Sequence, residues 1–187
     1  MKEPVLEPIL RELRIRKVLP IIRQYPDCRM LDVGCGWDCR LLKTVRPFIK
    51  SGIGIDFKVE KYEDDKIKTM PMTITDHLPF EPESFDIVTM LTFLEHLSDP
   101  LSMMRETERI LKNGGRLVLT VPGKIAKPVL EFLAYRIGIV SVTEMRDHKQ
   151  YYDHAELKKL FSQTGITIES HRYFQLGMNN YCVVKKA

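Results

Sequence analysis

The chain has 187 residues, of which 44% are hydrophobic and 29% are charged, and its formal net charge is +4. This length suits a single domain, 1–187, and argues against a second catalytic domain. The composition excludes a long disordered tail, and so mild a positive charge gives no support for a nucleic-acid-binding protein.

The four cysteines contain no C-x-x-C pair and no zinc-ligand pattern, which predicts free thiols in a reducing compartment. The first residues, MKEPVLEP, have acids and prolines where a secretion signal has a basic start and an apolar core. No later apolar run is long enough to span a bilayer. We therefore predict a cytoplasmic protein without stable membrane insertion, which leaves peripheral contact with a membrane open.

Residues 1–26 are predicted to form a basic helical segment. The stretch RELRIRKVLPIIR is rich in Arg and Lys, and Leu10, Leu13, Val18 and Ile21 are predicted to form its apolar face. Either this helix packs on the domain with its charges in solvent, or its basic surface meets an acidic substrate or a membrane.

Short apolar runs then alternate with helix-like stretches, which predicts an α/β fold with a doubly wound, mostly parallel sheet and helices on both faces. Two further apolar runs, 166–174 and 181–186, flank QLGMNN and predict an antiparallel hairpin at the sheet edge. The sheet should have about seven strands. The five parallel strands are predicted at 29–33, 52–55, 71–75, 85–91 and 116–121.

Two helices have clear start and stop residues. Asp99 is predicted to cap one whose first residue is Pro100, with Asn-Gly-Gly at 113–115 as its end. Asp153 begins a capping box, DHAE, for a second helix that should end at Gly165.

The stretch LDVGCGWD at 31–38 is the first sign of chemistry. Asp32 ends a predicted strand, and Gly34 and Gly36 let the backbone turn sharply and approach a ligand. A dinucleotide site would place a third glycine where Cys39 stands, which argues against a dehydrogenase using NAD or FAD. Asp56 ends the next strand, 20 residues after Gly36, where a carboxylate can accept hydrogen bonds from ribose hydroxyls.

Together with GIDF, TDHLPFEPESFDIVTMLTFLEHL and LKNGGRLVLTVP, this stretch resembles the motif series of class I S-adenosylmethionine-dependent methyltransferases. The closest resemblance is to the small single-domain group with D-x-G-x-G and LPF…SFD motifs, and it covers roughly residues 28–122. It implies a Rossmann-like sheet and methyl transfer from S-adenosylmethionine to a small-molecule acceptor, with S-adenosylhomocysteine as product. A non-catalytic S-adenosylmethionine-binding regulatory protein is the alternative, since the same motifs fit both.

The resemblance also implies roles for single residues. The glycine-rich loop would hold the methionine part of the cofactor, Asp56 the ribose and Phe57 the adenine ring. Asp76, or Thr75 in its place, would accept from the adenine amino group beside the His77 backbone. The predicted cofactor-binding residues are Asp32, Gly34, Cys35, Gly36, Asp56, Phe57, Asp76, His77, Met90 and Leu91, the last two near the reactive methyl.

Two histidines are the predicted catalytic residues. His96 belongs to a Glu95-His96 pair that related methyltransferases keep near the substrate, and His148 precedes the last helix. Each is either a base or substrate contact, or an ordinary structural or solvated histidine. Some relatives bind a divalent metal through this pair and another Glu, but Thr92 stands at that position, so no metal is predicted.

Residues 122–150 are too long for a structureless loop and are predicted to form a partly helical lid. With the basic N-terminal segment, this lid would cover an acceptor that has an apolar or acidic part. Plain core packing explains its apolar residues equally well. No nucleic-acid acceptor is predicted, because MLTF stands where base-methylating enzymes carry N/D-P-P-Y/F. The lid residues named for this role are Val129, Leu130, Phe132, Leu133 and Ile137 on the apolar side and Lys124, Lys127 and Arg136 on the basic side.

Overall fold

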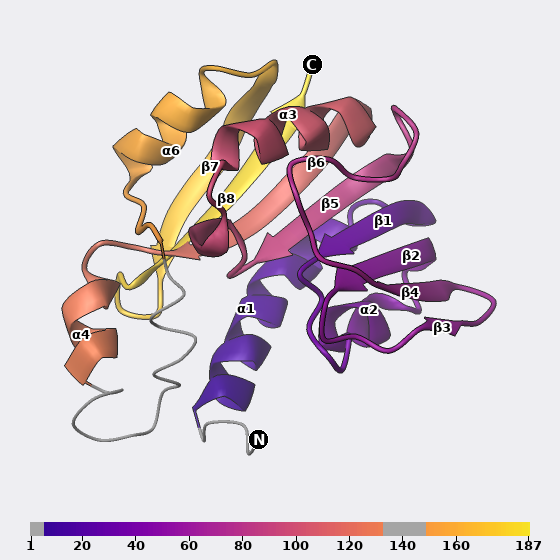
Figure 1. Cartoon of the computed structure of the whole chain (residues 1–187), viewed down its shortest axis with the longest axis horizontal. Coiled ribbons are helices and arrows are strands. Elements are labelled where there is room, and N and C mark those ends of the chain that lie inside the picture. The colour runs from indigo at the N-terminus through magenta and orange to yellow at the C-terminus, as the bar shows by residue number, and fades with distance from the viewer. Residues whose placement is uncertain (1–5, 133–148) are drawn as a thin grey trace.

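The computed structural model describes residues 6–132 and 149–187 as one mixed sheet with helices on both faces (Figure 1). The strands are β1 (Cys28–Val33), β2 (Ile49–Asp56), β3 (Tyr62–Glu63), β4 (Ile67–Pro71), β5 (Phe85–Leu91), β6 (Leu111–Pro122), β7 (Ile166–Phe174) and β8 (Asn179–Lys186). The described helices are α1 (Glu7–Ile22), α2 (Arg40–Val45), the 3₁₀ helix η1 (Leu94–His96), α3 (Pro100–Ile110), α4 (Ala126–Phe132) and α6 (His154–Phe161).

The strand order is β3-β4-β2-β1-β5-β6-β8-β7. The five strands from β4 to β6 in this order are parallel, whereas β3, β8 and β7 are antiparallel to their neighbours. The predicted parallel sheet with a C-terminal antiparallel hairpin is confirmed, with β3 as an additional edge strand. After β1 the chain continues outward through β2 to β3 and β4 on one side of the sheet. It then crosses to β5 on the other side of β1, so the strand order reverses at β1. In open α/β sheets, ligands bind at the carboxyl ends of the strands at such a switch point.

The central strands are buried on both faces. In β5, Ile87 enters the hydrophobic cluster packed against α1 and α2, whereas Val88 and Met90 enter the cluster packed against α3 and α6. In β6, Val118 and Leu119 divide between the two clusters in the same way. Figure 1 shows α3 in front of the sheet and α1 behind it. Burial on both faces explains why these strands are continuous apolar runs.

The predicted apolar face of α1 is partly wrong. Leu13 is 40% exposed, and the buried side is formed by Arg14, Ile15, Val18 and Ile22. The helix faces the sheet with a side rotated from the one that spacing indicated, and Arg14 lies on this buried side. Within the described residues, no helix is long and apolar enough to cross a membrane.

The prediction of a strand at 71–75 is also wrong. The chain pairs with β2 over Ile67–Pro71 instead, with Gly52 opposite Ile67 and Asp56 opposite Pro71. The buried residues of this strand, Ile67 and Thr69, flank Lys68, so it has no continuous apolar run. Proline closes the strand because it has no N–H for the ladder.

The predicted helix caps are confirmed. The Asp99 side chain accepts a hydrogen bond from the Ser102 N–H at 3.1 Å, and Asp153 and Glu156 form the predicted capping box. The helices end earlier than predicted, at Ile110 and Phe161. The Asn-Gly-Gly turn thus lies within the bounds of β6 and causes its shift in register against β5.

Candidate active site

The glycine-rich loop follows β1 and adopts the sharp turn that its sequence predicts. Gly34 and Gly36 have φ angles of +75° and +70°, which side-chain-bearing residues rarely adopt. The N–H groups of Gly34 and Cys35 both donate to the Ile55 carbonyl, at 2.9 and 3.2 Å, which ties the loop to the end of β2. A Cβ on Gly36 would meet nothing within 4 Å, so the space above this residue is open.

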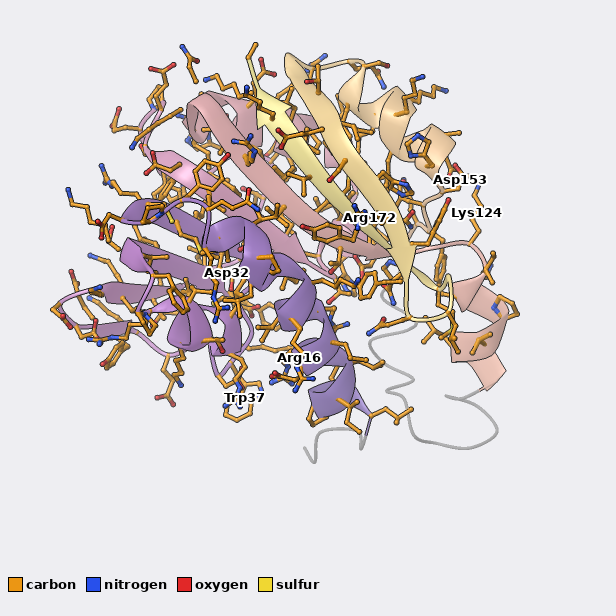
Figure 2. All side chains as sticks on the ribbon, turned by 180° about the vertical axis from the view of Figure 1, so that it is seen from behind. Arg16, Asp32, Trp37, Lys124, Asp153 and Arg172 are labelled. Atoms are coloured by element: carbon orange, nitrogen blue, oxygen red, sulfur yellow. The ribbon has the colours of Figure 1, made fainter. Side chains whose placement is uncertain are left out.

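Asp32 is buried at the carboxyl end of β1, 3% exposed, and accepts a hydrogen bond of 2.6 Å from the Thr89 hydroxyl of β5 (Figure 2). Burial raises the pKa of this carboxyl to about 7, the Thr89 hydrogen bond opposes the shift, and the nearby Asp56 charge adds to it. A carboxyl in this state is stabilised in its ionised form by a cationic group placed beside it.

Asp56 ends β2 and faces the same loop. Its Oδ2 accepts from the Gly36 N–H at 3.0 Å, and its Oδ1 accepts from the Lys58 N–H at 2.7 Å. Each carboxylate oxygen has a second lone pair, so both can accept a further hydrogen bond. Phe57 beside it is 69% exposed, with the Lys58 ammonium 5.1 Å from its ring centre.

The LPF segment is held by α3. The Leu78 N–H donates to Glu106 at 3.0 Å, and the Arg109 guanidinium donates to the carbonyls of Leu78 and Phe80 at 2.9 and 2.7 Å. This clamp fixes the loop that carries Asp76 and His77, whose side chains are both exposed. It gives the LPF motif a positioning role. Asp86 of the SFD part supports the start of β5 and its neighbours, because it accepts from the Arg29 N–H at 2.8 Å and from Lys112 at 2.7 Å.

At the carboxyl end of β5, Met90 is fully buried and Leu91 is half-buried. The next residue, Thr92, has a φ of +52°, an unusual conformation for a β-branched residue. Phe93 then packs against Gly34 on the neighbouring loop. This turn brings the end of β5 close to the glycine-rich loop.

The Glu95-His96 pair lies in η1, just past β5. Glu95 is fully buried, whereas His96 is half-buried. Burial raises the pKa of Glu95 to about 8, although the positive charge of Arg14 opposes the shift. Burial and the charge of Glu95 in turn raise the pKa of Tyr152, whose hydroxyl is buried without a hydrogen-bond partner among the described residues. The N–H of Lys149 binds the Glu95 carbonyl at 2.8 Å, so residues 149–152 line this side of the site.

Of the predicted lid, residues 133–148 lie outside the described part of the chain, and with them Leu133, Arg136, Ile137 and the predicted catalytic His148. Before them, α4 exposes 37% of Val129. The charge of Lys124 is already satisfied by Asp153 and Glu156, at 3.0 and 2.8 Å. Figure 2 shows Lys124 and Asp153 side by side, away from Asp32.

Two residues near this crevice escaped the sequence interpretation. Phe93, which covers Gly34, has no motif of its own, and a buried Arg14 is hidden in a stretch of solvent-facing basic residues. The run of five arginines and lysines gave no sign of which one turns inward. Among the residues described, no three His, Cys, Asp or Glu side chains are grouped to bind a metal.

Comparison with known proteins is consistent with this geometry. A family model described as "Methyltransferase domain" matches residues 7–171. The ubiquinone biosynthesis O-methyltransferase of Aliivibrio fischeri (strain ATCC 700601 / ES114) is 26% identical over 174 residues, 84% of this chain and 71% of that protein.

Solved structures share the fold. An S-adenosylmethionine-dependent methyltransferase from Methanosarcina mazei superposes with a TM-score of 0.64 at 20% identity, over 89% of this chain and 97% of that one. Another from Aquifex aeolicus gives a TM-score of 0.66 at 16% identity, over 92% and 89% of the two chains. The strand order, the glycine-rich loop and the family match agree, and this chain belongs to the methyltransferase domain family, with the class I fold of S-adenosylmethionine-dependent methyltransferases.

Proposed function

We propose that this protein transfers the methyl group of S-adenosylmethionine to a hydroxyl oxygen of a small-molecule acceptor. The observation that carries the proposal is the Asp56 carboxylate, which the Gly36 and Lys58 N–H groups fix at the carboxyl end of β2. Both of its oxygens retain acceptor capacity, which suits the two adjacent hydroxyls of a ribose.

The other residues of the crevice fit the same cofactor. The open space above Gly36 admits the methionine part, and the buried Asp32 carboxyl gains a counter-charge from its amino group. Phe57 offers an exposed apolar ring for adenine, and the exposed Asp76 an acceptor for the adenine amino group. Cys35, His77, Met90 and Leu91 complete the proposed cofactor contacts. The bound cofactor supplies an electrophilic methyl group, and the protein mainly has to position it and exclude water.

An oxygen acceptor is favoured by the relatives named O-methyltransferases and by the groups beside the site. A hydroxyl has to lose its proton as the new bond forms, so a nearby base helps. Glu95, with a pKa of about 8, is a stronger base than an ordinary carboxylate once it is ionised, and its charge also acts on the buried Tyr152 hydroxyl. His96 is the second candidate on the same short helix.

The acceptor is proposed to have an apolar or acidic part. A hollow of about 730 Å³ lies between α1 and the glycine-rich loop, and Ile9, Leu13 and Trp37 expose apolar surface to it. Figure 2 shows Arg16 and Trp37 on either side of this region. Arg40 also lines the hollow, beside the ion pairs Arg11–Asp38 and Arg16–Glu12.

Calorimetry with S-adenosylmethionine and S-adenosylhomocysteine tests the cofactor site. Asp56→Ala should weaken binding about 100- to 10,000-fold, because it removes two hydrogen bonds to a charged group that contribute about 1.5–3 kcal/mol each. The exposed Asp65→Asn serves as the matched control and should bind as the wild type does. Equal affinity of wild type and Asp56→Ala would overturn the proposed site.

A panel of hydroxylated small molecules, with formation of S-adenosylhomocysteine as the readout, tests the reaction. Turnover with hydroxyl compounds and none with matched amines or thiols supports oxygen transfer. Tight cofactor binding without turnover across the panel would instead favour the non-catalytic regulatory protein.

A further inference from the structure

Two cysteine thiols meet inside the proposed cofactor loop. The Sγ atoms of Cys35 and Cys39 lie 3.6 Å apart, and both residues are buried, 8% and 4% exposed. A disulfide bond requires about 2.05 Å between these atoms. The two thiols are therefore already neighbours, and only a local movement separates them from a covalent bond.

The contacts of the two thiols connect such a movement to the backbone of the glycine-rich loop. Both thiols point at the Gly36 carbonyl, at 3.6 and 3.7 Å, and the Gly36 N–H binds Asp56. A Cβ on Gly54 beneath the loop would stand 2.9 Å from the Cys35 Sγ, so Cys35 has little room to move toward β2. The loop itself has to adjust when the sulfurs approach.

We propose that Cys35 and Cys39 form a reversible disulfide on exposure to a hydroperoxide, and that this bond distorts the glycine-rich loop and weakens cofactor binding. The second half rests on the proposed function, whereas the first does not. Cys35 and Cys39 then form a redox-sensitive modification site within the proposed cofactor loop.

The chemistry needs only a hydroperoxide as oxidant. The Cys39 sulfur attacks one peroxide oxygen, the O–O bond breaks, and a sulfenic acid forms while the departing hydroxide takes the thiol proton and leaves as water. The Cys35 sulfur then attacks the Cys39 sulfur, the S–O bond breaks, and the second oxygen leaves as water with the Cys35 proton. The two thiols lose two electrons, and hydrogen peroxide is reduced to water.

Cys39 is the better attacking sulfur of the pair. The Cys35 thiol stabilises the thiolate form of Cys39 and lowers the Cys39 pKa. Cys28 and Cys182 differ, because burial raises their pKa values to about 11 and about 12 and leaves little thiolate. They are thus internal references that share the chain and its burial but lack a thiol partner among the described residues.

The sequence allows a direct mass test. Trypsin cleaves after Arg29 and Arg40, so residues 30–40 form one peptide that holds both thiols. After treatment with hydrogen peroxide and alkylation of free thiols, this peptide should appear unalkylated and lighter by two hydrogen atoms. Reduction before alkylation should restore two labels. A doubly alkylated peptide after peroxide treatment would overturn the proposal.

The same samples test the effect on the loop. Trp37, the only tryptophan, lies between the two cysteines, so its fluorescence reports the loop directly. Oxidation should change the Trp37 emission and weaken S-adenosylhomocysteine binding about tenfold in calorimetry, and a thiol reductant should reverse both. Cys39→Ser should show neither response to peroxide, whereas Cys182→Ala should respond as the wild type does.

The outcomes are separable. A disulfide that leaves emission and affinity unchanged would overturn the coupling to the cofactor loop. Absence of binding by the reduced wild type would count against the proposed function, and the peptide mass would still decide whether the disulfide forms.

Discussion

The ring of Phe93 lies directly against Gly34: a Cβ on this glycine would stand 2.6 Å from the Phe93 Cδ2. The turn after β5 and the loop after β1 are therefore packed against each other without room for a methyl group. The neighbouring Gly36 has a similar positive φ but open space around it. A comparison of alanine substitutions at these two glycines therefore separates the free-energy cost of the backbone conformation from that of close packing.

Gly34→Ala should lower the free energy of unfolding by about 3 kcal/mol, since backbone strain and overpacking add. Gly36→Ala should cost only about 1 kcal/mol, from backbone strain alone. Urea denaturation of both variants measures the difference. In a Phe93→Ala background, the cost of Gly34→Ala should fall to that of Gly36→Ala. An unchanged cost there would show that Phe93 is not the obstacle.

The buried carboxyl of Asp32 predicts a pH-dependent affinity. Its folded pKa of about 7 means that it is neutral below this pH and cannot pair with a cationic amino group. S-adenosylhomocysteine affinity should therefore rise roughly eightfold between pH 6 and 7.5, by the linkage of ionisation to binding. Calorimetry at a series of pH values measures this rise. Asp32→Asn should bind more weakly and lose most of the dependence, and a slope retained by this variant would contradict the assignment.

Glu95 should make the stability of the protein fall as pH rises. Its folded pKa of about 8 exceeds the ordinary 4.5, so the contribution of its neutral form is complete below about 4.5 and is lost as pH increases through 8. Across this window the loss is about 1.4 kcal/mol per pH unit. Glu95→Gln should remove this part of the slope. The free energy of unfolding of the variant, relative to the wild type, should therefore increase toward pH 8. The exposed Glu60→Gln provides the control, and its unfolding curve should follow the wild type at each pH.

Asn180 is predicted to be one of the most sensitive polar positions. It is fully buried, and its Nδ2 donates to the carbonyls of Val121 and Tyr152 at 3.2 and 2.8 Å, while Oδ1 meets His171 at 2.8 Å. Asn180→Ala leaves these groups unsatisfied and should cost about 2–4 kcal/mol in chemical denaturation. Asn179→Ala, one residue away and half-buried, should cost clearly less; equal losses would argue against this network.

Much of the fold was predictable because local sequence signals, such as helix caps and apolar runs, favour the same elements as the final packing. The caps at Asp99 and Asp153 and the strand 85–91 follow from short-range chemistry that the final packing leaves unchanged. The strand predicted at 71–75 was misplaced because its pairing partner, β2, determines its register, and because Lys68 and Thr69 interrupt the apolar run of β4. The inward face of α1 depended likewise on a tertiary contact, the burial of Arg14.

The candidate site was predictable to the extent that it lies in contiguous motifs. Asp32 and Asp56 lie at the carboxyl ends of the neighbouring strands β1 and β2, as their spacing indicated, and the Gly36 N–H donates to Asp56. The burial of Glu95 was not predictable, since it depends on α1, η1 and residues 149–152 meeting at one edge. The predicted roles of His96 and His148 remain predictions.

The packing of α1 has a consequence for how the chain folds during synthesis. This helix, Glu7–Ile22, shares its hydrophobic cluster with Phe174, Tyr181 and Val183, and Gln175 donates to the Leu10 carbonyl across a separation of 165 residues. Its buried face therefore has no complete partner until the last two strands leave the ribosome. Contacts so distant in sequence are slow to form. The earliest helix of the described chain therefore packs first against residues of α2, β1 and β2, and its packing is complete only after the last two strands have been synthesised.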